Sequence, residues 1–141
     1  MKIQSVLLLF YIFLISSPLL AQAKKTIPAS QIEFQSPEYV NKMYYLASHY
    51  GKYQTLLDSV KGNSEGQLVF KKSQKYVEGI YMLVTPDKKI ELEFMMDANQ
   101  KFSIQVTNPT DKTVAISNSI LNQDFNAFNS FFKTKMEGIK A

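Results

Sequence analysis

Alternating apolar and polar residues between positions 79 and 106 predict three β-strands. Every second residue of the middle strand is large and apolar, and the acids at 91 and 93 lie between them; the apolar set is Ile90, Leu92, Phe94 and Met96. The flanking segments 80–84 and 102–106 alternate in the same way. Such a period of two places the two sets of side chains on opposite faces of a strand. Because turn-forming sequences lie at both joints, PDKK at 86–89 and DANQ at 97–100, we expect a three-stranded meander with one buried face.

Further short segments of the chain also have the composition of strands. They are 32–34, 41–50, 53–60, 67–71 and 113–116. Gly51 and Lys52 join the second to the third, and a type II′ hairpin turn requires glycine at the first of its two central positions. Short strands with turn signals about every 8 to 12 residues are typical of sandwiches and barrels. We therefore predict a mainly β fold, an antiparallel β-sandwich of seven or eight strands with one C-terminal helix.

The period changes near residue 118, where apolar residues begin to recur at helical spacing. The positions i, i+4, i+7, i+11 and i+15 form one stripe, which we call the apolar stripe: Leu121, Phe125, Phe128, Phe132 and Met136. Ser117 or Ser119 is suited to cap the first turn, and lysines near the C-terminus suit the negative end of the helix dipole. We expect the helix to begin at about 118 and to end at Gly138.

The apolar stripe needs an apolar surface to pack against, and two surfaces can provide it. The first is an open face of the protein's own sheet, which we expect, and the second is a groove on another protein. Phe131 lies off the stripe and is expected to be exposed. Phe131, with Phe128 and Phe132 beside it, is therefore a candidate interaction surface.

The first 23 residues have the pattern of a secretory signal peptide. Lys2 precedes a long uncharged apolar run, and an A-x-A cleavage site follows at 21–23. The alternative is an uncleaved membrane anchor, but Pro18 and the modest apolar length favour cleavage near Ala23. The lack of cysteine excludes a lipoprotein anchor. We expect a periplasmic or secreted protein without stable membrane insertion after cleavage.

The size of the chain is that of one domain. Removal of 23 from the 141 residues leaves 118, which is enough to build a core without disulfides. We predict a flexible leader over 24–30 and one domain over 31–141. Because the sequence contains no cysteine, the fold depends on packing, and the chain cannot itself carry out thiol–disulfide exchange.

The charge pattern argues against nucleic acid as a partner. All 16 basic residues are lysine, they are scattered among 12 acids, and there is no arginine. Proteins that read nucleic acid depend on arginine for phosphate and guanine contacts. The lysine pairs at 24–25, 71–72 and 88–89 are more simply explained as solvated strand ends and turns.

The candidate catalytic chemistry is sparse. His49 is the only histidine, and nothing in the sequence places a serine nucleophile and a carboxylate beside it, so we expect it at a strand end facing solvent. One histidine without cysteine makes a zinc site implausible. Glu91 and Glu93 share a strand face and resemble the two catalytic carboxylates of a glycosidase. The alternation of polar residues on a solvent-exposed strand face explains them more simply. No catalytic, cofactor-binding or metal-binding residue is assigned.

Tyrosines are concentrated in the first half of the predicted sheet. They are Tyr44, Tyr45, Tyr50, Tyr53, Tyr76 and Tyr81. Cross-strand aromatic pairing is the simpler explanation. The alternative is a platform for a sugar or peptide ligand, on which Tyr45 and Tyr81 would be the contacts.

The order of several short motifs points to a known family. The chain carries YYLASHYGKYQTLLDSV at 44–60, GQLVF at 66–70, GIY at 79–81, QKFSI at 100–104 and SxxNxxFxxF at 119–128. In this order and spacing the motifs resemble the β-rich N-terminal domain that precedes the thioredoxin domain in TlpA/ResA-like thiol–disulfide oxidoreductases of the Bacteroidota. The resemblance covers about residues 31 to 136.

The chain also departs from that family. Leu68 stands where an aromatic is usual, Lys72 where glycine often follows the strand, and Val77-Glu78 where Pro-Gly is common. The sequence stops at Ala141, where the family continues into a thioredoxin fold with its C-x-x-C, so no catalytic residue carries over. The resemblance implies an accessory domain that assists positioning, substrate contact or assembly.

These observations lead to one functional expectation and one alternative. We expect an exported, non-enzymatic envelope module that acts by protein–protein contact, with a thioredoxin-like protein among its candidate partners. The alternative is a module that binds a small glycan or peptide through a tyrosine-rich sheet face. Neither requires a cofactor.

Overall fold

The computed structural model describes residues 27–140, so the predicted signal peptide lies outside the described residues. Ser30, at the end of the predicted leader, is already buried in the first strand. The elements, in chain order, are β1 (Ser30–Gln35), η2 (Pro37–Tyr39), β2 (Met43–Tyr50), β3 (Tyr53–Lys61), β4 (Gln67–Lys72), β5 (Gly79–Val84), β6 (Ile90–Met96), β7 (Lys101–Asn108), β8 (Thr113–Ser117) and α2 (Ile120–Lys140).

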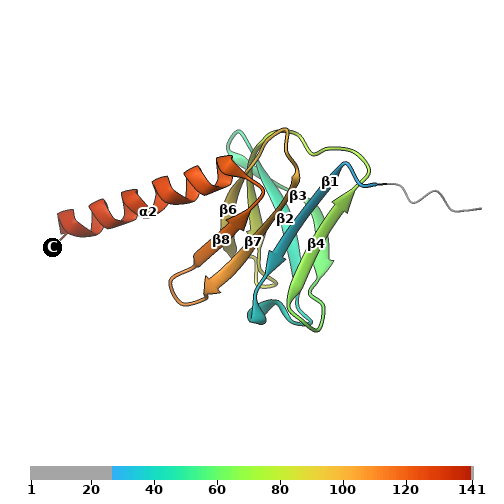
Figure 1. The fold of residues 1–141 in the computed structure, drawn as a ribbon, viewed down its shortest axis with the longest axis horizontal. Helices are drawn as coiled ribbons and strands as arrows, with labels where there is room; N and C mark the ends of the chain where they lie inside the picture. The colour runs from blue at the N-terminus through green and yellow to red at the C-terminus, as the bar shows by residue number, and fades with distance from the viewer. Residues whose placement is uncertain (1–26, 141) are drawn as a thin grey trace, which may run out of the picture.

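The eight strands form two four-stranded sheets that pack face to face (Figure 1). Their strand orders are β4-β1-β7-β8 and β3-β2-β5-β6. Five of the six strand pairs are antiparallel, and β1 pairs with β7 in parallel. The predicted mainly β sandwich with one C-terminal helix is therefore confirmed. The parallel pair was not predicted, because side-chain alternation is the same in both kinds of ladder.

The core lies between the two sheets and is rich in aromatic rings. Phe94 of β6 lies at its centre, with ring centroids 5.2 Å from Phe34, 6.0 Å from Phe102 and 6.1 Å from Tyr81. All four side chains are buried. Aromatic pairs at these distances and tilted angles stabilise a core beyond the area that they bury. The pattern read from the sequence thus locates the core correctly in β1, β6 and β7.

Only the second half of β6 buries its predicted apolar face in the core. Phe94 is buried, whereas Ile90 is exposed. The register between β5 and β6 shifts between Leu83 and Val84, which leaves Glu91 as an extra residue. Such a bulge changes which side chains face the core, and a period-two pattern does not reveal it.

The predicted three-stranded meander is wrong. β5 and β6 form a hairpin around the PDKK turn, but β7 lies in the other sheet between β1 and β8. The connection at 97–100 is therefore a crossover between sheets. At its end the backbone N–H of Gln31 donates to the carbonyl oxygen of Gln100 over 2.7 Å, which joins the crossover to β1.

The side chain of Gln100 is buried and makes paired hydrogen bonds to a distant backbone segment. Its Oε1 accepts from the N–H of Tyr76 and its Nε2 donates to the carbonyl of Tyr76, both over 2.8 Å. We call such a side-chain amide, bonded to both the N–H and the C=O of one residue, an amide clamp. Because donor and acceptor are both satisfied, the buried amide stabilises the connection between β4 and β5 at little desolvation cost.

The turn at 62–66 packs against η2, a short helix that the sequence pattern does not predict. A Cβ on Gly62 would lie 1.9 Å from the carbonyl oxygen of Tyr39, and a Cβ on Gly66 would lie 2.0 Å from that of Ser36. Gly66 also has a φ of +77°, which favours glycine. Both positions therefore require glycine to let β3 cross into β4.

The two sides of the sandwich are closed differently. On one side the edge strands β3 and β4 contact each other, and on the other the first turns of α2 contact the edge strands β6 and β8. Figure 1 shows α2 leaving the sandwich from this second side and extending away from it. The β-body therefore fixes where the helix begins.

Candidate functional site

Helix α2 begins at a well-formed cap. Ser119 is buried, and its Oγ accepts from the backbone N–H of Asn122 over 3.2 Å, so the predicted capping by Ser119 is confirmed. The residue before it, Asn118, has a φ of +64°, which turns the chain from β8 into the helix. The helix starts at Ile120, two residues after the predicted position.

A second amide clamp joins this first turn to the edge strand β6. The Oδ1 of Asn122 accepts from the N–H of Met95 over 2.7 Å, and its Nδ2 donates to the carbonyl of Met95 over 2.9 Å. The same Nδ2 also donates to Ser119 Oγ over 2.9 Å. Asn122 is buried, and its amide satisfies edge backbone groups that would otherwise be open for pairing.

Two further contacts bind the start of the helix to the rest of the body. Gln123 Nε2 donates to the carbonyl of Ile116 in β8 over 2.9 Å, and Asn99 Nδ2 donates to the carbonyl of Asn118 over 2.5 Å. The first turn is thus hydrogen-bonded to one edge strand of each sheet. This arrangement sets the direction of the whole helix.

Beyond its second turn, α2 has almost no contact with the β-body. Phe125 and Asn126 are half-buried, and residues 127–139 are exposed. The side of the helix that faces the body is mostly polar: Asn122, Asn126 and Asn129 line a small hollow of about 50 Å³ above β6 and β8, and Phe125 of the apolar stripe lies at its border. At about 100° per residue, this asparagine side and the apolar stripe lie roughly a quarter turn apart.

Beyond Phe125 the apolar stripe is consequently exposed, so the expectation that it docks on its own sheet is wrong. The exposed fraction is 62% for Phe128, 55% for Phe132 and 39% for Met136. Phe131 is exposed to 62%, as predicted, and Ile139 continues the stripe with 77% exposed. The physical reason is the asparagine clamp, which turns the polar side of the helix toward the body.

The expected helix end at Gly138 is also wrong, since α2 continues through Lys140. A glycine ends a helix by taking a positive φ, and Gly138 is not among the residues with positive φ. The cost of glycine inside a helix is about 1 kcal/mol relative to alanine. The helical pattern of the residues around it is sufficient to carry the helix through this position.

The exposed aromatic rings of the helix, on the stripe and at Phe131 beside it, contact one another and a lysine. The rings of Phe128 and Phe132 stack with centroids 6.2 Å apart, and the Nζ of Lys135 lies 5.6 Å above the ring of Phe131. With about 150–250 Å² for each aromatic side chain, the exposed apolar surface of the helix is on the order of 600 Å². That is as large as the largest apolar patch on a typical monomer.

The structure places the two candidate tyrosines on opposite faces of one sheet. Tyr45 pairs with Val84 and Tyr81 pairs with Ser48, and positions 45 and 48 of β2 face opposite ways. Tyr45 is half-buried on the outer face, with Lys88 Nζ 3.4 Å from its ring centroid. Tyr81 is buried inside, where burial raises its pKa and its hydroxyl donates to the carbonyl of Val77. The two do not form one platform.

A hollow of about 650 Å³ lies beside Tyr81 and was not predicted. It is formed where the β4–β5 connection passes the end of the β2–β3 hairpin, and apolar side chains of Leu57, Val77 and Ile80 line it. The hydroxyl of Tyr76, which also lines it, donates to Asp58 Oδ2 over 3.0 Å. The tyrosine hydroxyls are therefore already occupied. The connection at 73–78 has no periodic pattern, so this hollow could not be predicted from the sequence.

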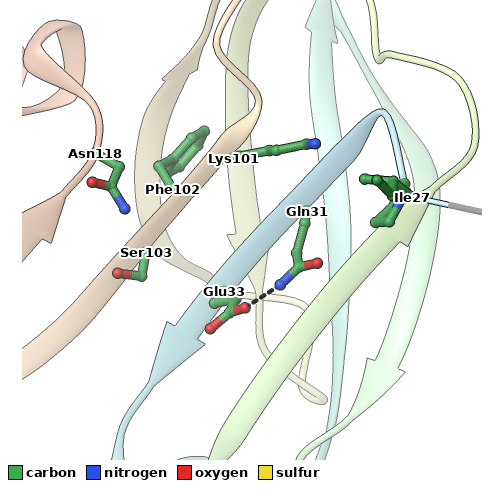
Figure 2. A pocket seen from close by; sticks show the side chains of 8 residues that line it. Ile27, Gln31, Glu33, Lys101, Phe102, Ser103 and Asn118 are labelled. Atoms are coloured by element: carbon green, nitrogen blue, oxygen red, sulfur yellow. Dashed lines mark hydrogen bonds between the residues drawn. The ribbon is translucent and has the colours of Figure 1, made fainter.

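A shallower depression of about 240 Å³ lies on the outer surface of the sheet that contains β1 and β7. Figure 2 shows Gln31 and Glu33 of β1 in its floor, with Lys101, Ser103 and Asn118 around them. Gln31 Nε2 donates to Glu33 Oε1 over 2.5 Å. The side chains of Gln31 and Glu33 are thus paired with each other, which is typical of a solvated sheet surface.

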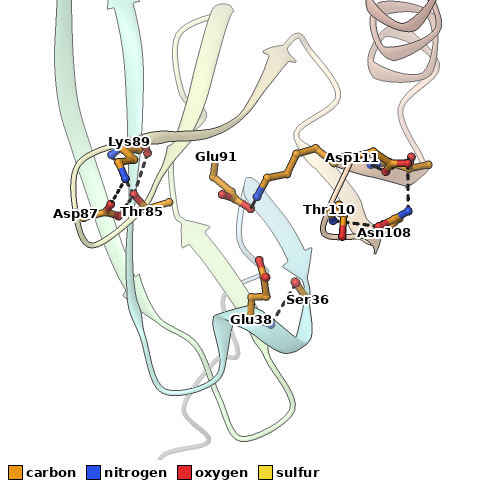
Figure 3. Close-up of polar contacts among 11 residues, drawn as sticks. Ser36, Glu38, Thr85, Asp87, Lys89, Glu91, Asn108, Thr110 and Asp111 are labelled. Atoms are coloured by element: carbon orange, nitrogen blue, oxygen red, sulfur yellow. Dashed lines mark hydrogen bonds and ion pairs between the residues drawn. The ribbon is translucent and has the colours of Figure 1, made fainter.

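The two strand acids of β6 do not form a pair. Because Glu91 is the extra residue of the bulge, its carboxylate is mostly buried and pairs with Lys112 over 2.5 Å (Figure 3). Glu93 instead lies 3.4 Å from His49 Nε2 on the other side of the sheet. The predicted common face is therefore wrong, while the expected strand-end position of His49 in solvent is confirmed.

The β5–β6 turn beside Glu91 is stabilised by a local network, also seen in Figure 3. The Thr85 hydroxyl donates to Asp87 Oδ1 over 2.6 Å, and Lys89 Nζ lies 3.0 Å from Asp87 Oδ2. These contacts, the hydrogen bond from Thr85 first, lower the pKa of Asp87 to about 2. The network explains why PDKK forms the turn that the sequence predicts.

Within residues 27–140, no three His, Cys, Asp or Glu side chains gather as a metal site. No helix in that same range combines the length and apolarity needed to cross a bilayer. No protein-family model matches the chain, and no curated protein gives a significant match.

Proposed function

We propose that the protein is an exported, non-enzymatic module of the cell envelope that binds another protein through helix α2. One observation carries the proposal: the apolar stripe is exposed on a helix whose first turn is fixed rigidly to both sheets. A long row of exposed aromatic side chains is costly to keep in water and marks an interaction surface.

The attachment of the helix also favours binding. An isolated helix of about 12–15 residues is only marginally stable in water. Here the Ser119 cap and the Asn122 clamp nucleate the helix before any partner arrives. A preformed helix loses less conformational entropy on binding, and amphipathic helices are a common recognition element for grooves and for other helices.

The envelope location rests on the N-terminal sequence and on the family resemblance. A basic start, an apolar run and an A-x-A site at 21–23 are typical of exported proteins. The motifs SxxN and QKFSI, which support the resemblance to the domain preceding thioredoxin folds, contain the two clamp residues Asn122 and Gln100. Because these two residues have structural roles, they support a similarity of fold to that domain, and they do not point to a catalytic residue. A thioredoxin-like protein stays one candidate partner.

Site-specific photo-crosslinking in living cells tests the proposal. A photoreactive amino acid at position 128 is compared with the same amino acid at position 130, which lies on the opposite side of the helix. We expect crosslinks to protein in the envelope fraction from position 128 and few from position 130. Equal crosslinking from both positions, or protein retained in the cytoplasm, would contradict the proposal.

A second candidate function is the binding of a small ligand in the hollow beside Tyr81. Its volume of about 650 Å³ lies within the usual range of ligand sites, about 300–1,000 Å³. Val77→Lys, at an exposed position of the lining, should block a bound glycan or peptide without loss of fold. Tyr45→Ala on the opposite face is the matched control. Binding that Tyr45→Ala removes and Val77→Lys leaves intact would exclude the hollow as the site.

A further inference from the structure

The apolar stripe of α2 is complementary to itself. An arrangement of two antiparallel helices, symmetric about residue 130, sets Leu121 opposite Ile139 of the second copy and Phe128 opposite Phe132 of the second copy. Position 125 lies level with 135 of the second copy, so the nearest apolar partner of Phe125 is Met136, one residue (about 1.5 Å) further along the axis. Every large residue of the stripe has an apolar partner, and the same surface is used on both copies, as a two-fold interface requires.

The charges on the helix favour this antiparallel order. Asp124 and Lys135 lie on the same flank of the stripe, within about 20° of each other on the helical wheel. In the antiparallel pair, Asp124 therefore lies beside Lys135 of the second copy. A parallel pair would instead align the lysine-rich ends of both helices and their dipoles, which is unfavourable.

The surface is large enough for a weak dimer. Two exposed stripes of about 600 Å² each give about 1,200 Å² in total, the lower end of the range for specific interfaces. Phe125 is half-buried beside β6 and β8, but the stripe beyond it is exposed over residues 127–139, so the two bodies would sit at opposite ends of the helix pair. The body does not obstruct the approach of a second helix to this part of the stripe.

A lipid surface fits the helix less well than a second copy. Membrane-surface helices carry a strongly cationic polar face. The polar side of α2 consists mostly of asparagine, glutamine, serine and threonine, and its lysines at 133, 135 and 140 are offset by Asp124 and Glu137. The electrostatic attraction to anionic lipid is therefore small.

We propose that α2 binds a second copy of this chain, antiparallel, with the apolar stripes in contact and Asp124 beside Lys135 of the second copy. This inference rests on the proposed function, because it names the protein that occupies the same surface. It makes the protein a dimer with its two sandwiches held apart.

Charge exchange tests the pairing. The mass of the purified exported protein is measured by sedimentation over a concentration series, with a dissociation constant expected at about 1–100 μM. Asp124→Lys and Lys135→Glu alone should each weaken association about three- to tenfold, and the double variant should restore most of it.

Phe128→Ser should abolish association, while Ser130→Ala, on the opposite side of the helix, should leave it unchanged. Dimers that Phe128→Ser does not weaken would overturn this inference, because they would form through another surface.

Cysteine crosslinking tests the orientation, without background because the chain contains no cysteine. Asp124→Cys and Lys135→Cys proteins are oxidised separately and as an equal mixture. In the antiparallel dimer, the mixture forms disulfide dimers much faster than either protein alone. Fast crosslinking of each protein with itself would show a parallel pair and overturn the inference.

Two other outcomes separate this inference from the proposed function. A protein that stays monomeric at about 1 mM, yet crosslinks from position 128 to a different protein in cells, overturns the self-association and leaves the proposed function standing. Flotation with phosphatidylglycerol vesicles that Phe128→Ser abolishes, without protein crosslinks, overturns both.

Discussion

The β-body and the distal part of α2 use the same residue type in opposite ways. In the body, Phe94 is 1% exposed and touches aromatic rings from both sheets. On the helix, Phe128 and Phe132 are mostly exposed and touch chiefly each other. A periodic apolar pattern therefore reports that a surface will be buried, but it does not report whether the chain itself supplies the partner.

The largest contrast is expected from removal of one ring in each region. Phe94→Ala should destabilise the protein by about 3–5 kcal/mol, because it leaves a cavity at the centre of the core. Phe128→Ala should change the stability of the monomer by less than about 0.5 kcal/mol, since its ring is in water. Urea unfolding of dilute protein measures both, and similar losses would contradict the division between the two regions.

The junction between the regions should show an intermediate effect. Asn122→Ala removes both hydrogen bonds to Met95 and should cost about 1–3 kcal/mol, because edge backbone groups lose their partner. We also expect faster hydrogen exchange at Met95 and throughout α2, with the far strands β1 and β4 unchanged. Asn129→Ala, a step further along the same side of the helix, is the control. Uniform acceleration across all strands would mean that the clamp supports the whole body.

Alkaline pH should affect the body before it affects the helix. Burial, with a smaller contribution from the Glu91 carboxylate, raises the pKa of Tyr44 to about 12. The unfolded chain has the ordinary tyrosine pKa of about 10, so the stabilising contribution is complete below about pH 10 and is lost as the pH rises toward 12. Absorbance of tyrosinate and circular dichroism should change together in that window. In Tyr44→Phe the loss of stability with pH should be shallower, and an unchanged slope would contradict this assignment.

The smallest effect is expected at the end of the helix. A Cβ on Gly138 meets nothing within 4 Å, and its backbone is helical. Gly138→Ala should raise the helix content and stabilise the last turn by about 0.5–1 kcal/mol. The same substitution at Gly66 should destabilise the body, because its φ is positive and a Cβ would collide with Ser36. Circular dichroism during thermal unfolding compares the two variants.

Side-chain alternation was sufficient to predict most of the fold. It located the strands around Phe34, Phe94 and Phe102, and the change of period near 118 located the helix. It did not predict that β7 crosses to the other sheet, because that depends on the Gln31–Gln100 contact between segments far apart in the sequence. The bulge at Glu91 was also not predicted, because one extra residue leaves the alternation of apolar and polar residues in β6 unchanged.

The candidate site was predicted in part. The apolar stripe and the exposed Phe131 follow directly from helical spacing. The direction of the stripe does not, because it is decided by Asn122 and Met95, which meet only in the folded chain. The separation of Tyr45 from Tyr81 likewise depends on strand register, which residue composition does not contain.

The asparagine clamp has a mechanical consequence for the far end of the helix. From Asn122 to Ile139 the axis is about 25 Å long at 1.5 Å per residue, so a tilt of about 10° at the clamp moves the tip by about 4 Å. A small change in the geometry of the β6 edge therefore produces a larger displacement at the tip of α2. The distance between the β-body and a partner bound at the tip of α2 therefore depends on the two hydrogen bonds between Asn122 and the backbone of Met95.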